Sequence, residues 1–131
     1  MKYLTVNEII QTNRFIIEQA GEGTIGVQDM NGIESIVTQP QLSFFGKEAY
    51  PTLWLKSAYI LQKITKKHCY LDGNKRTALL CTIIFLKYNN YKLNLAPQIA
   101  TDLVLEATIE PDTETEMVKI AAFIEKNSTK I

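Results

Sequence analysis

The sequence predicts an all-α fold: a compact, single-domain bundle of about six helices around one buried central helix. Helix-capping patterns recur along the chain, whereas the alternation of apolar and polar residues that is typical of strands is weak throughout. One segment, residues 78–86, is apolar nearly all the way round a helix, as expected of a central helix. The 131 residues have the length of one ordinary domain, so we expect a single domain over residues 1–131.

Capping residues and helix breakers locate the first half of the bundle. Thr5-Val6-Asn7-Glu8 has the form of a capping box and predicts a first helix, which Gly21 ends. A shorter helix is expected from about residue 29 to 38, because Pro40 disfavours α geometry in the residue before it. Residues 41–51 are too irregular for a helix and too apolar for a solvated loop, so we expect them to cover another part of the molecule.

The second half of the chain carries four more helix patterns. A helix is expected over about residues 52–67, with lysines in its last turns that complement the helix dipole, and the apolar central helix over about 74–89. Pro97 suits the first turn of a helix that runs to about Ile109. Thr113-Glu114-Thr115-Glu116 repeats the capping-box form and predicts a last helix.

Composition excludes several classes of protein. The 14 Lys and Arg residues balance 14 Asp and Glu residues, so a broad basic surface for nucleic acid is not expected. The two cysteines, Cys69 and Cys81, stand in apolar contexts, which suggests neither a disulfide scaffold nor a zinc site. The first residues become polar too soon for a signal peptide, and the longest apolar run is shorter than the ~20 residues that span a bilayer. We therefore expect a cytoplasmic protein without a membrane segment.

Polar chemistry is concentrated in residues 68–78, which contain the only histidine of the chain. The start of the following helix presents free N–H groups and a positive dipole end, so this segment is suited to hold an anion, most plausibly phosphate. A carboxylate beside phosphate is a natural Mg²⁺ ligand, and a histidine is suited to act as general base near neutral pH. The candidate site residues are His68, Asp72, Gly73, Asn74, Lys75 and Arg76.

Each of these residues also has a purely structural interpretation. His68 could cap the preceding helix, Asp72 or Asn74 could cap the next one, and Lys75 and Arg76 could be solvated first-turn residues. Cations at a helix N-terminus are unfavourable, however, unless an anion meets them there. The two adjacent cations therefore favour the functional interpretation of the whole segment.

The pattern His68-x-Tyr70-x-Asp72-Gly73-Asn74-Lys75-Arg76 resembles the signature of the Fic/Doc superfamily in its Doc (death-on-curing) form, usually H-P-F-x-D-G-N-K-R-T-A. The resemblance extends upstream and covers most of residues 29–86. Cys69 stands where proline is common, which leaves the loop less rigid, and Tyr70 stands where phenylalanine is common, which adds a hydroxyl that needs a partner.

The resemblance implies a toxin of a toxin–antitoxin pair. Members of the Doc type use ATP and Mg²⁺ to transfer the γ-phosphate to a threonine of elongation factor Tu, which arrests translation. It also implies the roles of the site residues. His68 would be the base, Asp72 the Mg²⁺ ligand, and Gly73, Asn74, Lys75 and Arg76 would hold phosphate, with Lys66 helping to position the nucleotide and residues 42–51 aligning the target as a flap.

Two other functions remain open at this point. Fic relatives with a glycine at the position of Lys75 transfer AMP instead, and the same residues could do so here. A helical binding module without enzymatic activity could present a set of basic side chains to nucleic acid, although the zero net charge argues against it. The basic residues in question are Lys63, Lys66, Lys67, Lys75 and Arg76.

Control of the activity can also be addressed from the sequence. Many Fic proteins carry an inhibitory helix with the pattern Ser/Thr-x-x-x-Glu-Gly. The only Glu-Gly pair here is Glu22-Gly23, and Glu18 precedes it by four positions where Ser or Thr would stand. We therefore expect restraint in trans, by an antitoxin segment that folds on binding to an apolar groove.

Overall fold

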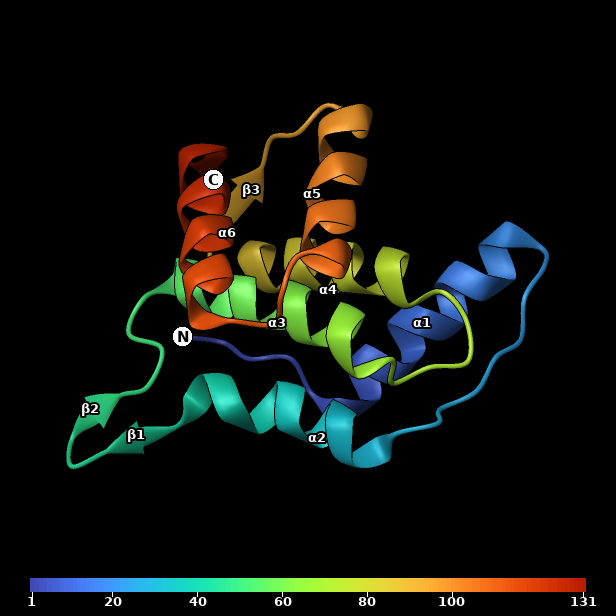
Figure 1. Ribbon diagram of the computed structural model, residues 1–131, viewed down its shortest axis with the longest axis horizontal. Helices are drawn as coiled ribbons and strands as arrows, with labels where there is room; N and C mark the ends of the chain where they lie inside the picture. The colour runs from blue at the N-terminus through green and yellow to red at the C-terminus, as the bar shows by residue number, and fades with distance from the viewer.

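The computed structural model describes all 131 residues and consists mainly of helices (Figure 1). The expected mostly-α fold with six α-helices is confirmed, and a short 3₁₀ helix, Gln39–Gln41, follows the second of them. The α-helices are α1 (Val6–Ala20), α2 (Met30–Thr38), α3 (Leu53–Lys67), α4 (Asn74–Tyr88), α5 (Pro97–Ile109) and α6 (Glu114–Lys126).

The helix boundaries agree closely with the capping signals. Thr5 forms the complete capping box of α1 with Glu8, and Gly21 ends that helix in the left-handed conformation. The box predicted for α6 is only half formed, because Thr113 accepts a bond from the Glu116 N–H but the Glu116 side chain does not return it. Glu116 Oε1 is buried without a partner, and burial raises the pKa of this carboxyl group.

Two small antiparallel sheets complete the fold, and the sequence did not predict them. β1 (Ser43–Phe44) and β2 (Lys47–Glu48) form a hairpin within the irregular apolar segment that follows α2. β3 (Tyr91–Leu93) pairs with β4 (Ser128–Lys130) and joins the end of α4 to the end of α6. Strands of two or three residues are too short to show a period of two in the sequence.

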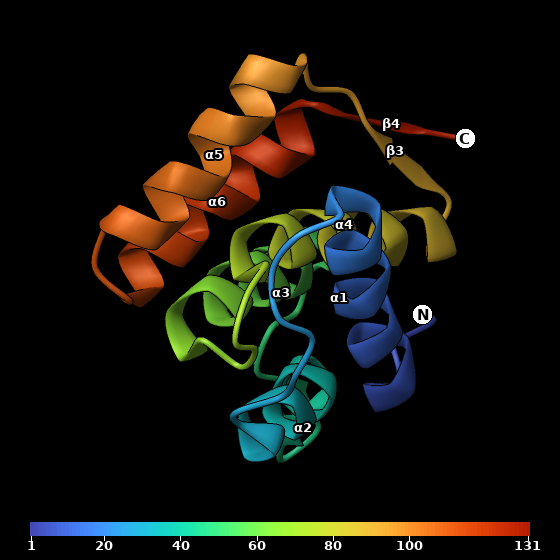
Figure 2. The same cartoon turned by 90° about the vertical axis from the view of Figure 1, so that its right-hand side faces the viewer.

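The hydrophobic core is built around α3 and α4 together. α3 packs against α2, α4, α5 and α6, and α4 packs against α1, α3 and α5. In Figure 2 the two helices lie next to each other, between α2 on one side and the α5–α6 hairpin on the other. α4 was predicted to be the one buried central helix, whereas the structure places two helices, α3 and α4, at the centre. α3 shares the centre, and four apolar side chains of α4 are only half-buried: Leu79, Leu80, Ile83 and Ile84.

A buried lysine attaches the β1–β2 hairpin to this core. The Lys56 side chain lies almost completely inside, where its Nζ donates to the Pro40 carbonyl at 2.6 Å and to Glu48 Oε1 at 3.1 Å. The hairpin itself projects away from the bundle (Figure 1) and exposes Phe44 and Phe45 at its tip. None of the helices combines the length and the apolar character that crossing a membrane requires.

Candidate active site

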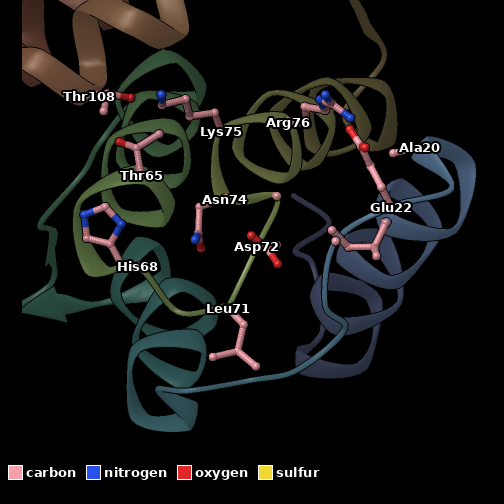
Figure 3. Close-up of a pocket in the computed structure, with 13 residues that line it drawn as sticks. Ala20, Glu22, Thr65, His68, Leu71, Asp72, Asn74, Lys75, Arg76 and Thr108 are labelled. Atoms are coloured by element: carbon pink, nitrogen blue, oxygen red, sulfur yellow. The ribbon is translucent and has the colours of Figure 1, made fainter.

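The site begins where α3 ends. His68 adopts the left-handed conformation, with φ 47°, and so terminates the helix. Its carbonyl accepts a hydrogen bond from Gln28 Nε2 at 2.6 Å, while the imidazole is exposed at the edge of a cavity (Figure 3). His68 therefore occupies the capping position that the structural interpretation expects and also presents its ring to the cavity.

Backbone hydrogen bonds to the segment between α1 and α2 hold the loop after His68. The Cys69 carbonyl accepts from the N–H groups of Gln28, at 2.8 Å, and Asp29, at 3.2 Å, and the Leu71 N–H donates to the Gly26 carbonyl at 3.1 Å. These bonds restrain the loop in place of the proline that the motif usually carries. Burial raises the pKa of the Cys69 thiol to about 11, so this cysteine is a packing residue rather than a nucleophile.

Tyr70 finds the partner that its additional hydroxyl needs. The side chain is buried, and its hydroxyl donates to the Ile9 carbonyl of α1 at 2.8 Å. This bond ties the site loop to the first helix.

Replacement of Tyr70 by phenylalanine tests this bond. We expect Tyr70→Phe to lower the free energy of unfolding by about 1 kcal/mol, the usual net contribution of one such hydrogen bond. Urea denaturation would measure the change, with Tyr91→Phe as the control, because the Tyr91 hydroxyl makes no hydrogen bond within the protein. Equal unfolding midpoints for the two variants would contradict the prediction.

The turn into α4 depends on Gly73 and Asn74. Gly73 has a φ of 78°, and a Cβ there would lie 3.0 Å from Ile17 Cδ1, so the position requires glycine. The Asn74 side chain closes the loop, because its Oδ1 accepts from the Tyr70 N–H at 3.1 Å and its Nδ2 donates to the Tyr70 carbonyl at 2.9 Å. Any contact of Asn74 with phosphate would therefore use its backbone N–H rather than its side chain.

The Asp72 carboxylate points into the cavity, and one of its two oxygens is hydrogen-bonded within the protein. Its Oδ2 accepts from the Thr24 N–H at 2.7 Å, and its Oδ1 makes no hydrogen bond within the protein. No group of three or more His, Cys, Asp or Glu side chains forms a metal cage anywhere in the molecule. A single exposed carboxylate with a free oxygen fits Mg²⁺, which takes one or two protein carboxylates and completes its shell with phosphate and water.

The side chains meet in a cavity of about 580 Å³ between α1, the site loop and the start of α4. Lys75 and Arg76, in the first turn of α4, are exposed to it and take part in none of the salt bridges of the protein. Figure 3 shows His68 on one side of the cavity, Arg76 on the other, and Asp72 between them. Two cations without ion-pair partners beside the N–H groups of a helix start are an arrangement that can bind an anion such as phosphate.

Comparison with known proteins identifies this arrangement. The model of the Fic/DOC family matches residues 3–86, which contain the whole site loop, α1 to α3 and all but the last two residues of α4. The chain belongs to the Fic/Doc family.

Two relatives place it near the Doc members of that family. The protein is 36% identical to Toxin Doc of Mycolicibacterium smegmatis over 104 residues, which are 77% of this chain and 80% of the relative. It is 30% identical to Protein kinase doc of Escherichia phage P1 over 110 residues, which are 84% of this chain and 86% of the relative. The Fic/Doc match thus extends well beyond the site motif in both relatives.

Lys66 does not line the cavity of this Fic/Doc protein. Its Nζ donates to the Thr108 carbonyl at 2.6 Å and so fixes the end of α5 against α3. Thr108 itself lines the cavity, so Lys66 reaches the cavity through this residue, and its part in positioning the nucleotide stays a prediction.

Sequence reasoning missed Asn13, a buried polar residue in the middle of α1. Its Nδ2 donates to the Asp72 carbonyl at 2.8 Å and to Thr77 Oγ1 at 3.1 Å. Asn13 therefore links α1 both to the turn at Asp72 and to α4. The signal was available, because Asn13 stands among the apolar positions of an amphipathic helix, where a polar residue needs specific partners. Which partners it finds depends on the tertiary fold.

We expect Asn13→Ala to loosen the Asp72 turn. The predicted result is a roughly tenfold lower transfer rate and a free energy of unfolding lower by about 1–2 kcal/mol, because two hydrogen bonds are lost. Steady-state kinetics and urea denaturation would measure the two effects, with Gln11→Ala on the exposed face of α1 as the control. An unchanged rate despite the lower stability would contradict a positioning role for Asn13.

Glu22 also lines the cavity, although it lies outside any inhibitory sequence pattern. Figure 3 draws its carboxylate toward the guanidinium of Arg76, although the two groups do not form an ion pair. A negative charge in a phosphate site opposes nucleotide binding. We expect Glu22→Gln to tighten ATP binding severalfold in calorimetry, with Glu18→Gln as the control outside the cavity. Weaker binding would contradict this electrostatic effect.

Proposed function

We propose that this protein is the toxin of a toxin–antitoxin pair and a protein kinase of the Doc type. It transfers the γ-phosphate of ATP, with Mg²⁺, to a threonine hydroxyl of elongation factor Tu in the cytoplasm and so inhibits translation. The observation that carries the proposal is the cavity in which the imidazole of His68 and the unpaired cations of Lys75 and Arg76 meet. The name of the phage P1 relative, Protein kinase doc, supports phosphate transfer over other chemistry.

In the proposed reaction His68 transfers the proton, and Lys75 and Arg76 stabilise the charge on the phosphate. The imidazole takes the proton of the target hydroxyl, the oxygen forms a bond to the γ-phosphorus, and the bond from that phosphorus to the bridging oxygen breaks, so that ADP leaves. Lys75 and Arg76 stabilise the negative charge that spreads over the phosphate oxygens. Mg²⁺ neutralises further phosphate charge when bound, and the free Oδ1 of Asp72 would hold it.

The β1–β2 hairpin is suited to hold the target segment. Phe44 and Phe45 are exposed at its tip, while the Lys56–Glu48 contact attaches its base to the core. Exposed aromatic side chains on a firmly attached hairpin can bind a protein segment and bring its hydroxyl to the cavity.

Two labels on ATP separate the two transfer reactions. The purified protein is incubated with elongation factor Tu and ATP labelled either on the γ-phosphate or on the adenine. Only the γ-label should become bound to the target. Incorporation of the adenine label instead would establish AMP transfer, and incorporation of neither would refute both reactions for this target.

The structure argues against the nucleic-acid binding module. Lys63 pairs with Asp112 at 2.5 Å, and Lys66 donates to the Thr108 carbonyl, so two of the five basic side chains that this function would use are engaged within the protein. Affinity for a nucleic-acid backbone requires cations that are free to replace counterions. No specific observation favours this function.

The proposed antitoxin would act on an apolar surface of α4. Leu80 and Ile83, one turn apart on that helix, are half-buried and, unlike Leu79 and Ile84, do not pack against the core cluster. An amphipathic antitoxin helix could complete their burial. Expression of the protein alone should arrest growth, and co-expression with the product of a neighbouring antitoxin gene should relieve the arrest. Harmless expression of the protein alone would contradict restraint in trans.

A further inference from the structure

One buried lysine holds both ends of the segment that forms the β1–β2 hairpin. Lys56 lies in the first turn of α3, and only 1% of its side chain is exposed. Its Nζ donates to the Pro40 carbonyl, which precedes the hairpin, at 2.6 Å and to Glu48 Oε1, in β2, at 3.1 Å. Two points of the chain on either side of β1 therefore meet at one nitrogen atom.

Little else ties the hairpin to the helices. Residues 43–49 are all exposed, and the other hydrogen bonds of residues 42–49 stay within the hairpin or reach only the short 3₁₀ helix before it. The contact from Lys56 to Glu48 is the only hydrogen bond or ion pair between these residues and one of the six α-helices. A buried ammonium is costly without acceptors, so Lys56 favours the position of the hairpin that supplies them.

The position of Lys56 on α3 relates the hairpin to the active site. α3 carries Lys56 in its first turn and ends at His68, so one helix carries both the attachment of the hairpin and the imidazole. The twelve residues between them correspond to about 18 Å of helix. The ring of Tyr3 lies 5.6 Å from the same Nζ, within the range of a cation–π contact, and helps to hold the ammonium in place.

We propose that Lys56 is a positioning residue that preorganises the β1–β2 hairpin for the target protein. The inference rests on the proposed function, because it takes the hairpin to hold the target segment. Lys56 is too deeply buried to contact the target itself and acts through Pro40 and Glu48 on the place of Phe44 and Phe45. A hairpin already held in position loses less conformational freedom when the target binds, so the affinity for the target is higher.

The same placement leaves nucleotide binding outside the influence of Lys56. The side chain does not line the cavity that contains His68, Lys75 and Arg76. A change at Lys56 should therefore alter the use of the protein target without altering the affinity for ATP.

Two variants break the contact from opposite ends. Lys56→Met keeps the length of the buried side chain and removes the donor. Glu48→Ala removes the acceptor, and because the Glu48 side chain is half-exposed, this change does not disturb the core. Lys63→Met is the matched control, since it makes the same substitution on the same helix and also breaks an ion pair, with Asp112, away from the hairpin. Glu48→Gln keeps an acceptor oxygen and is the conservative variant.

Three measurements separate positioning from a general loss of structure. Steady-state kinetics with elongation factor Tu and γ-labelled ATP give KM for the target and kcat, and calorimetry gives the affinity for ATP. Hydrogen exchange at the Ala49 N–H, which donates to the Leu42 carbonyl at 2.9 Å, reports the order of the hairpin base without any assay of transfer.

Lys56→Met and Glu48→Ala should each raise KM for the target at least about tenfold and accelerate exchange at Ala49. kcat and the affinity for ATP should stay within about twofold of the parent, because the target still settles on the hairpin at saturation. Glu48→Gln and Lys63→Met should behave nearly as the parent. The double variant should be no weaker than the weaker single variant, because both changes break one contact.

A parental KM or parental exchange at Ala49 in Glu48→Ala would overturn the positioning role and leave the proposed function standing, even if Lys56→Met failed to fold. An equal loss of affinity for ATP and for the target, or a rise in KM as large in Lys63→Met, would overturn it in the same way. Absence of transfer by the parent would overturn the proposed function and this inference with it.

Discussion

Loss of the His68 imidazole should abolish transfer. We expect His68→Ala to lower the rate constant for transfer by about 10²–10⁴-fold, the usual contribution of a general base, because no other histidine is available to take the hydroxyl proton. In the proposed reaction the imidazole acts on the hydroxyl rather than on ATP, so ATP affinity should stay within about twofold of the parent. Single-turnover kinetics and calorimetry would measure the two quantities.

The backbone at His68 determines the choice of control. Because its φ is 47°, we include His68→Asn, since asparagine tolerates the left-handed conformation better than alanine. Both variants should fold as the parent, because the hydrogen bond from Gln28 goes to the backbone carbonyl and not to the ring. Lys67→Ala, next to the site but outside the cavity, should leave transfer unchanged. Growth arrest by either His68 variant as strong as that by the parent would refute the assignment of the base.

Local chemistry explains why so much of the fold could be predicted. Thr5, Asp29 and Thr52 begin their helices with side-chain bonds to residues three positions away, and such bonds are properties of a short sequence. Gly21 and Pro97 act on their own backbone. The strands β3 and β4 could not be predicted in this way, because they join segments more than 30 residues apart and each has only three residues.

The candidate site was predictable where its chemistry is consecutive in sequence. His68, Asp72, Lys75 and Arg76 all line one cavity because a loop and the first turn of a helix carry them. Asn13 and Glu22 were missed, since only tertiary packing brings α1 and the segment after it to that loop. The close approach of Asn13 Nδ2 to the Asp72 carbonyl, at 2.8 Å, exists only in the folded chain.

The structure also shows contacts of two predicted site residues that the sequence did not indicate. Lys66 was expected to help position the nucleotide because it stands two positions before the histidine; its ammonium donates to the Thr108 carbonyl, and that role stays a prediction. Asn74 was expected to hold phosphate as part of the helix-start backbone; its side chain closes the loop on Tyr70, and the backbone contact with phosphate stays a prediction. Sequence position alone does not distinguish a side chain that contacts a ligand from one that shapes the backbone around it.

Lys75 should separate phosphate transfer from AMP transfer. It lines the cavity that the His68 imidazole and the Arg76 guanidinium also line, where the proposed function places the phosphates of ATP. We expect Lys75→Gly to lower the rate constant for γ-phosphate transfer by about 10²-fold, comparable to the loss of one preorganised group that stabilises developing charge.

Because glycine also weakens the first turn of α4, a second variant is needed. Lys75→Met keeps the length of the side chain and removes the charge, and it should lose as much of the transfer rate. Lys75→Arg should retain more of the rate than either, since it keeps the charge in a different geometry. Rates would be measured with ATP labelled on the γ-phosphate and, in parallel, on the adenine. A parental rate of γ-phosphate transfer in both the glycine and methionine variants would show that the charge of Lys75 does not determine the reaction.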